Sequence, residues 1–239
     1  QEFGKVGAPS TWVLSNHDVV RHATRLALTD ENPQGEGIGP NTPNLPEPAV
    51  GLRRARASST LMLALPGGAY LYQGEELGLP EAIDLPDDAR QDPTWFRTNG
   101  ERYGRDGCRV PLPWESGKPA FGFSSTGESW LPQPAGWDSY ARDAQLEDQS
   151  STLNLYRRLL QLRQDHALGT GTLQWIDGTE DEVLAFANGN VLVVANYAAT
   201  PLPLPVQAHS ATELVRSQME QSAEPGMIPG ETAIWFQLA

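Results

Sequence analysis

The sequence predicts an α/β fold in its first two thirds and a small antiparallel β domain in its last third. Two short apolar runs, at residues 11–15 and 69–73, read as buried strands on either side of a helical segment at residues 49–65. Strand, helix, strand is the repeating unit of parallel α/β folds. Residues 152–166 have apolar side chains spaced at three and four, which predicts a second amphipathic helix. After residue 172, short strand-like runs alternate with turns.

Polar residues follow both predicted strands. The first strand (TWVLS) runs directly into Asn16-His17-Asp18, and the second (AYLYQ) runs into the tripeptide GEE. The helical segment between them (AVGLRRARASSTLMLAL) stops at the breaker PGG. Side chains that follow parallel strands gather at one edge of the sheet, where α/β proteins place their sites.

The remaining chain divides into a loop and a β region. Residues 77–149 are rich in Pro, Gly and Trp and show little periodicity, and a loop of that size is usually functional. The dipeptide Asn188-Gly189 between two strand-like runs indicates a hairpin. We therefore expect one domain over residues 1–169, containing the long loop insertion 77–149, and an all-β domain over residues 170–239.

Composition excludes several classes of function. The 239 residues carry a formal net charge of −13, which disfavours nucleic acid and anionic membrane surfaces as partners. Cys108 is the one cysteine, so no internal disulfide can form. Zinc, phosphate-loop and calcium-loop motifs are absent, and no cofactor is implied. Residues 1–9 lack the apolar core of a signal peptide, which says little for a chain that is expected to start inside a domain, and a cytoplasmic location is expected only by default.

Three motifs carry a family resemblance. Residues 12–25 read WVLSNHDVVRHATR and resemble the fourth conserved region of glycoside hydrolase family 13, the α-amylase superfamily. Residues 70–78 (YLYQGEELG) are similar to the eighth strand and its exit in the α-glucosidases of that family. Residues 104–114 (GRDGCRVPLPW) resemble the RDxxRTPMxW signature of the same enzymes. The motifs occur in family order and resemble α-glucosidases and oligo-1,6-glucosidases.

The resemblance implies a fold and a site. It implies the C-terminal end of a (β/α)8 TIM barrel, with strands seven and eight and their helices, followed by a small antiparallel β-sandwich. By resemblance, Asp18 is the aspartate that stabilises the positively charged, oxocarbenium-like transition state. His17 is expected to hold the hydroxyls of the glucose at the cleavage point.

The same resemblance implies roles for the arginines. Arg105 is expected to help close the pocket behind the non-reducing-end glucose, and Arg109 to form a structural ion pair, although a guanidinium can serve either purpose. Arg21 either reaches the rim of the site and contacts substrate or is an exposed structural arginine. His22 has no metal-like spacing and is expected at the surface or at a helix cap.

The same family pattern predicts an incomplete site. A family enzyme has a nucleophilic aspartate after its fourth strand and an acid/base glutamate after its fifth, both upstream of the motif at residues 16–18. We therefore expect a C-terminal fragment that lacks both groups and is inactive alone. Its expected partners are an α-glucosidic oligosaccharide and the missing N-terminal half of the barrel. Exposed edges of orphaned strands also predict self-association of the fragment.

The implied activity of the parent is retaining hydrolysis of terminal α-linked glucose from short oligosaccharides. Three alternatives remain open. The parent could be a transglycosylating relative of the sucrose or trehalose isomerase type. The chain could be a non-catalytic interaction subunit of the same fold. Residues 170–239 could form a free-standing carbohydrate-binding domain.

Overall fold

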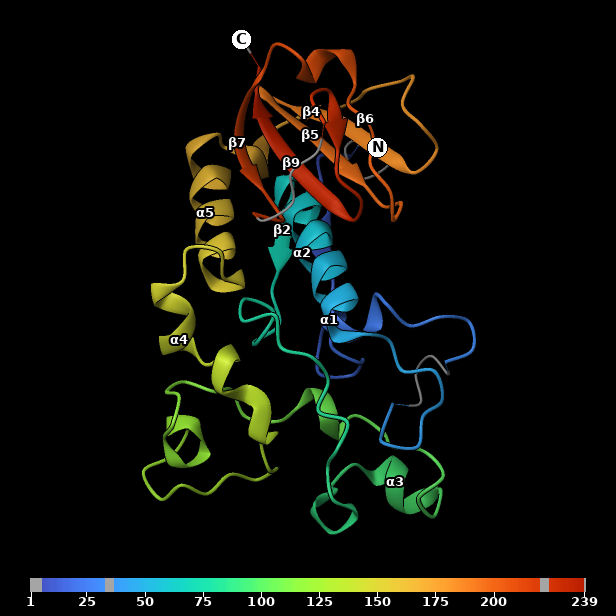
Figure 1. Ribbon diagram of the computed structural model, residues 1–239, viewed down its shortest axis with the longest axis vertical. Helices are drawn as coiled ribbons and strands as arrows, with labels where there is room; N and C mark the ends of the chain where they lie inside the picture. Colours follow the sequence, from blue (N-terminus) through green and yellow to red (C-terminus); the bar gives the residue numbers. More distant parts are fainter. Residues whose placement is uncertain (1–5, 33–36, 220–223, 239) are drawn as a thin grey trace. The chain divides into compact units, whose positions relative to one another are not determined.

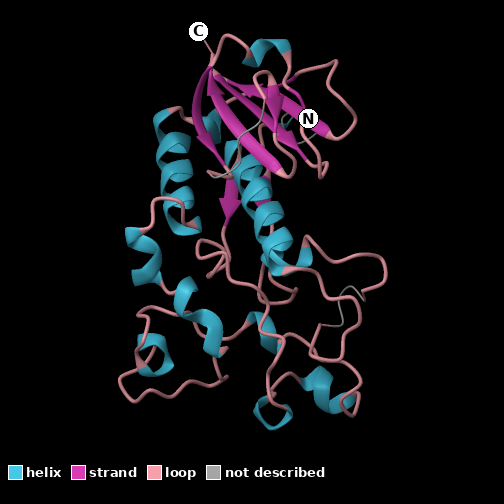
Figure 2. Cartoon of the chain, in the orientation of Figure 1, coloured by secondary structure: helices cyan, strands magenta, loops and turns pink. Residues whose placement is uncertain are grey.

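The structure is a computed structural model that describes residues 6–32, 37–219 and 224–238. The chain divides into two compact units. Unit 1 comprises Gln1–Val13, Arg53–Tyr70 and Leu155–Ala239, and unit 2 comprises Leu14–Leu52 and Leu71–Asn154. All strands assigned in the described residues belong to unit 1, and the described residues of unit 2 form helices, turns and loops (Figure 2).

The predicted strand–helix–strand unit is present. Strand β1 (Thr11–Val13) pairs in parallel with β2 (Gly68–Tyr70). Helix α2 (Pro48–Ala64) lies between them in sequence and ends just before the Pro-Gly-Gly breaker, as predicted. The second predicted helix is α5 (Thr152–Asp165). The parallel pairing confirms the α/β character of this part, whereas its assignment as the end of a (β/α)8 barrel stays a prediction.

The C-terminal part of unit 1 is an antiparallel sheet, as predicted. Its strand order is β3-β4-β5-β9-β7, and a separate two-stranded ladder joins β6 to β8. Their bounds are β3 (Leu173–Trp175), β4 (Val183–Asn188), β5 (Val191–Asn196), β6 (Leu202–Pro203), β7 (Thr212–Arg216), β8 (Met227–Ile228) and β9 (Thr232–Gln237). Strands β7 and β8 were not predicted from the sequence. The sandwich arrangement and the domain boundary at residues 169 and 170 remain predictions.

The predicted hairpin joins β4 to β5. Asn188 is the last paired residue of β4 and lies opposite Val191, so the loop consists of Gly189 and Asn190. Gly189 has a φ of 60°, which a two-residue hairpin requires at its first central position and which glycine adopts without strain.

Strand β5 is buried along its whole length because both faces of the sheet are covered. On one face, Leu192 and Val194 belong to an apolar cluster with Ile234 and Phe236 of β9. On the other face, Ala195 packs with residues of α2. Figure 1 shows α2 running beside these strands within unit 1.

One buried side chain ties the sheet to that helix. Trp235 of β9 is fully buried, and its indole Nε1 donates a hydrogen bond to the Thr60 carbonyl of α2 at 2.9 Å. Arg53 and Arg54 of the same helix form ion pairs with Glu231, at 2.9 and 2.7 Å. The sheet therefore packs on α2 through one large apolar contact with a charged contact beside it.

Unit 2 has a core of its own without strands among its described residues. It contains α1 (His22–Arg25), α3 (Pro93–Arg97) and α4 (Arg142–Glu147), joined by short 3-10 turns. The segment 77–149 thus carries short helices within the expected long loop. Its apolar cluster comprises Leu77, Leu79, Ala82, Leu85, Val110, Leu131 and Trp137. No helix in the described part of the chain is both long and apolar enough to cross a membrane.

Candidate functional site

The tripeptide Asn16-His17-Asp18 forms a tight turn in unit 2. The Asn16 side-chain oxygen accepts a hydrogen bond from the Asp18 backbone N–H at 2.7 Å, an Asx-type bond that fixes the turn. His17 Nε2 lies 3.4 Å from Asp18 Oδ2. The side chain of Asp18 is 49% exposed and that of His17 is 65% exposed, so both are open to a ligand.

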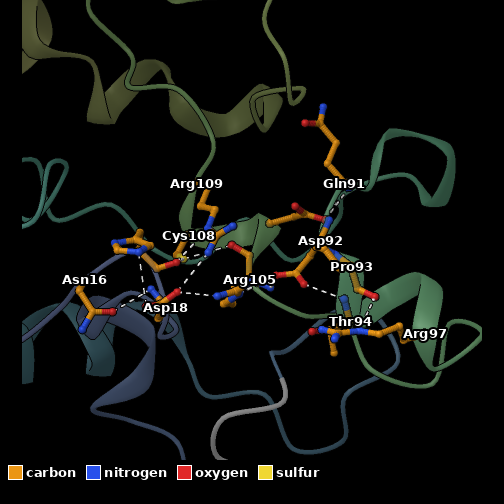
Figure 3. Close-up of polar contacts among 12 residues, drawn as sticks. Asn16, Asp18, Gln91, Asp92, Pro93, Thr94, Arg97, Arg105, Cys108 and Arg109 are labelled. Atoms are coloured by element: carbon orange, nitrogen blue, oxygen red, sulfur yellow. Dashed lines mark hydrogen bonds and ion pairs between the residues drawn. The ribbon is translucent and has the colours of Figure 1, made fainter.

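Two arginines of the third motif hold the Asp18 carboxylate (Figure 3). Arg105 Nη1 lies 2.6 Å from Asp18 Oδ1, and Arg109 Nη2 lies 3.2 Å from the same oxygen. Arg109 also donates its Nε–H to the His17 carbonyl at 2.8 Å. The structure thus brings together four of the five predicted site residues, Asp18, His17, Arg105 and Arg109, in one cluster.

These contacts keep Asp18 ionised. The hydrogen bond from Arg105, reinforced by the charges of His17, Arg105 and Arg109, holds the pKa of the Asp18 carboxyl below its usual range, although partial desolvation opposes the shift. A general acid needs a raised pKa so that it carries a proton near neutrality. Asp18 is therefore suited to be a fixed negative charge and unsuited to donate a proton.

Two site carboxylates were missed by the sequence reasoning. Asp92 accepts hydrogen bonds from both the backbone and the side chain of Arg105. Asp106 accepts hydrogen bonds from the backbone N–H groups of Gln91 and Asp92. The signal for Asp92 was present, because an aspartate before Pro93 and Thr94 is typical of a helix N-terminus, and Asp92 does cap α3. That cap says nothing about Arg105, which is distant in sequence.

Cys108 connects the second and third motifs. Its single S–H lies within reach of two acceptors, the Arg105 carbonyl at 3.1 Å and the His17 carbonyl at 3.5 Å from Sγ, and its own carbonyl accepts a hydrogen bond from the Tyr72 hydroxyl at 3.0 Å. Burial raises the pKa of the Cys108 thiol to about 12. Because the thiolate is the reactive form of cysteine, Cys108 is a structural residue here and not a nucleophile.

Arg21 is buried next to the second motif. The alternative of an exposed arginine is wrong: its side chain is 2% exposed. The guanidinium donates to the Gln73 carbonyl at 2.8 Å and lies over the Tyr72 ring, with 5.3 Å from Cζ to the ring centroid. Arg21 thereby joins the first motif to the second, and its contact with substrate stays a prediction.

Two buried titratable groups lie beside Arg21. His22 is the first residue of α1, whose N-cap is Arg21, and it is 2% exposed, so the expectation of a surface or cap residue is wrong. Burial, with the charges of Arg25 and Arg21, lowers the pKa of His22 to about 3. Burial likewise raises the pKa of Glu81 to about 7, although Arg21 opposes that shift. The folded state therefore favours neutral forms of both side chains.

No group of three or more histidine, cysteine, aspartate and glutamate side chains is arranged to hold a metal ion in the part of the chain that the structure describes. The polar groups of the cluster are arginine N–H donors, carboxylates and an imidazole. Guanidinium N–H groups can donate hydrogen bonds to vicinal hydroxyls, and a carboxylate can stabilise a positive charge.

Comparison with known sequences identifies the family. The profile described as alpha amylase, catalytic domain, matches residues 4–171. The chain belongs to the α-amylase family. This confirms the resemblance of the three motifs, and the matched region contains the whole Asp18 cluster.

Curated relatives are named mainly as glucosidases. The probable alpha-glucosidase of Rhizobium meliloti is 36% identical over 184 residues, which cover 75% of this chain and 29% of that protein. The salivary alpha-glucosidase of Anopheles gambiae is 30% identical and covers 84% of this chain and 30% of that protein. The trehalose synthase/amylase TreS of Mycobacterium tuberculosis is 28% identical. This α-amylase family chain spans about 30% of the length of the first two relatives.

Solved structures match nearly the whole of this chain. The alpha-glucosyl transfer enzyme XgtA matches with a TM-score of 0.72 and 30% identity, over 97% of this chain and 41% of that chain. The isomaltulose synthase of Klebsiella matches with a TM-score of 0.71 at 23% identity, over 99% of this chain and 44% of that chain, and its likeness bears on the fold alone.

Proposed function

We propose that this chain is the C-terminal part of a retaining α-glucosidase and supplies the charge-stabilising half of its site. The parent protein hydrolyses terminal α-linked glucose from short oligosaccharides. Asp18 stabilises the oxocarbenium-like transition state, His17 donates to the hydroxyls of the reacting glucose, and Arg105 closes the pocket behind it.

The observation that carries the proposal is the state of Asp18. It is a half-exposed carboxylate that Arg105 and Arg109 keep ionised beside an exposed imidazole. A preorganised negative charge of this kind stabilises developing positive charge without reorganising during the reaction. Arginine N–H groups in the same cluster are available to pair with sugar hydroxyls when a substrate displaces part of the ionic network.

We further propose that the 239-residue chain does not hydrolyse glucosides by itself. Retaining hydrolysis needs a nucleophilic carboxylate and a second carboxyl that carries a proton, about 5–5.5 Å apart. The two carboxylates that share Arg105 are unsuited to the second task, because hydrogen bonds from Arg105 hold the pKa of Asp18 and that of Asp92 below their usual range. By family resemblance, the nucleophile and the acid/base belong to a segment before Asn16.

The first test measures glucose release from maltose and p-nitrophenyl α-glucoside by the purified chain. The expected rate equals that of buffer. In parallel, saturation-transfer NMR with maltose is expected to show contact with the chain that weakens in Asp18→Asn and persists in Asp143→Asn, a matched change at an aspartate elsewhere in unit 2. Turnover that Asp18→Asn abolishes would overturn the proposed inactivity. Maltose contact that ignores Asp18→Asn would overturn the assigned site.

The names of the matched proteins favour glucosyl transfer as a second candidate function. A trehalose synthase, an isomaltulose synthase and a glucosyl transfer enzyme are among them. Transfer and hydrolysis use the same Asp18 chemistry and differ in whether water or a sugar hydroxyl accepts the glucosyl group. Product analysis of the longer parent protein with sucrose and maltose separates them, since transfer yields a new glucoside, either a disaccharide isomer or a longer sugar, and hydrolysis yields monosaccharides alone.

The partner that we propose for the β1–β2 pair is the N-terminal part of the barrel. Val13 and Tyr70 are register partners at the end of this pair, and they are 49% and 66% exposed. Exposed apolar side chains on a two-stranded parallel ladder favour association, since parallel sheets are normally covered on both faces.

Without that partner, the chain is expected to self-associate at tens of micromolar by light scattering. Tyr70→Lys should reduce the apparent mass because it places a charge on the apolar edge, whereas Val206→Lys, at an exposed valine elsewhere in unit 1, should not. A monomeric wild-type chain would contradict this proposal.

A further inference from the structure

The side chain of Asp92 lies against Arg105 and is fully buried. Its Oδ2 accepts a hydrogen bond from the Arg105 backbone N–H at 2.9 Å and from the side-chain Nε–H at 2.7 Å. Its Oδ1 accepts the Thr94 backbone N–H at 2.8 Å and caps α3. One carboxylate thus holds both the backbone and the guanidinium of the arginine that contacts Asp18.

This grip fixes the direction of the guanidinium. The group is planar, so binding Nε to Asp92 determines where the remaining nitrogens point. Nη1 points to Asp18 Oδ1, at 2.6 Å, and Figure 3 shows Arg105 lying between the two carboxylates. The Arg105 side chain is long and 37% exposed, so without Asp92 it would sample several rotamers. Ordering it in one rotamer to hold a ligand would then cost conformational entropy.

The position of Asp92 is itself determined by its surroundings. Asp106, which is 2% exposed, accepts the Gln91 and Asp92 backbone N–H groups at 2.9 and 3.0 Å. Gly104 packs against Asp92 so closely that a Cβ there would lie 2.8 Å from the Asp92 Cγ. Gly104 also has a φ of 70°, which other residues rarely adopt. The third motif therefore contains the arginine, the glycine that makes room for Asp92, and the aspartate that holds it.

We propose that Asp92 is a positioning residue, which orients Arg105 so that its guanidinium holds the Asp18 carboxylate in place. The proposal rests on the function assigned above to Asp18 and Arg105 and extends it to a residue outside the three motifs. Asp92 acts through Arg105 and does not touch Asp18 in the described contacts.

The two tasks of Asp92 can be separated by substitution. Asparagine and serine are both good helix caps, so Asp92→Asn and Asp92→Ser keep an acceptor for the Thr94 N–H. Asparagine loses the negative charge at nearly constant shape, and serine is also too short to reach the Arg105 Nε. A change in the Asp18 titration that occurs in both variants is therefore due to the loss of the Asp92–Arg105 contact and not to unfolding of α3.

The experiment is an NMR titration of carboxyl-labelled aspartates in the full chain. In the wild type, the Asp18 midpoint is expected below that of an ordinary aspartate, because Arg105 hydrogen-bonds to the charged form. In Asp92→Asn and Asp92→Ser, the midpoint should move upward. Asp143→Asn is the matched control, because Asp143 accepts backbone N–H bonds from Ser116 and Ala144 in the same unit. An Asp18 midpoint that stays or falls in the Asp92 variants would overturn the proposal.

A wild-type measurement covers the case in which the variants do not fold. The Arg105 Nε–H is expected to exchange with solvent more slowly than the Arg97 Nε–H, whose bond to the Pro93 carbonyl is 3.3 Å long and exposed. Equal exchange rates would also overturn the proposal. Neither readout needs a sugar or turnover. If the Asp18 midpoint moves but maltose contact ignores Asp18, the proposed function fails and the positioning stands. If the Asp18 midpoint does not move but maltose contact depends on Asp18, the proposed function stands and Asp92 has no positioning role in it.

Discussion

Lowering the pH from 6.5 to 3 is expected to cost the folded chain up to about 5 kcal/mol through His22 alone. Burial lowers the pKa of His22 from 6.5 to about 3. Between these two pH values the unfolded state binds a proton on His22 and the folded state does not. The contribution is fully present above pH 6.5 and is lost as the pH falls toward 3. In His22→Gln this loss disappears, which denaturant unfolding at a series of pH values measures.

Glu81 opposes this effect in part of the range. Its pKa is raised from 4.5 to about 7, so the folded state binds the extra proton there. Stability from this group is greatest below pH 4.5 and falls by up to about 3 kcal/mol as the pH rises through 7. The two slopes nearly cancel between pH 4.5 and 6.5, so the wild-type loss attributable to His22 is expected to become visible below pH 4.5.

The two variants should therefore differ in sign. Between pH 4.5 and 6.5, stability should fall with rising pH in His22→Gln and rise in Glu81→Gln. His209→Gln, at an exposed histidine of unit 1, is the control and should follow the wild type. Parallel pH profiles for the wild type and His22→Gln would show that His22 is not held neutral.

Trp235→Ala is expected to lower the free energy of unfolding of unit 1 by about 3–5 kcal/mol, the range typical of a buried tryptophan. Trp235 is fully buried in the central part of the sheet, and its indole bonds to the Thr60 carbonyl of α2. The substitution leaves a cavity and also removes the indole hydrogen bond to that carbonyl. Hydrogen–deuterium exchange of β5 and β9 measures the loss without requiring both units to unfold in one step.

Trp175→Ala is the matched control for this change. Trp175 lies on β3 in the same sheet, is 52% exposed, and makes an edge contact with Phe186. Its loss should cost about 1 kcal/mol or less. Equal protection losses in the two variants would mean that the contact with α2 does not support the sheet.

The local elements could be predicted because their signals are local. The helical spacing of residues 49–65 and 152–166 and the breaker after the first of them predicted α2 and α5 almost to the residue. Strand β7 (TELVR) was missed, because its side chains alternate weakly and it is held by pairing with β9, 20 residues further on. Register with a distant strand is not encoded in a short run of residues.

Local patterns in the sequence were enough to predict the family, the two helices and the antiparallel character of the C-terminal part, and to select Asp18, His17, Arg105 and Arg109 as candidate site residues. Each of these depends on a contiguous motif or a local period. Two features could be recognised only in the folded chain: Arg105 is shared between Asp18 and Asp92, and Arg21 is buried over Tyr72. These contacts join residues 13 to 87 positions apart, and a side chain's partners and burial depend on which distant segments the fold brings beside it.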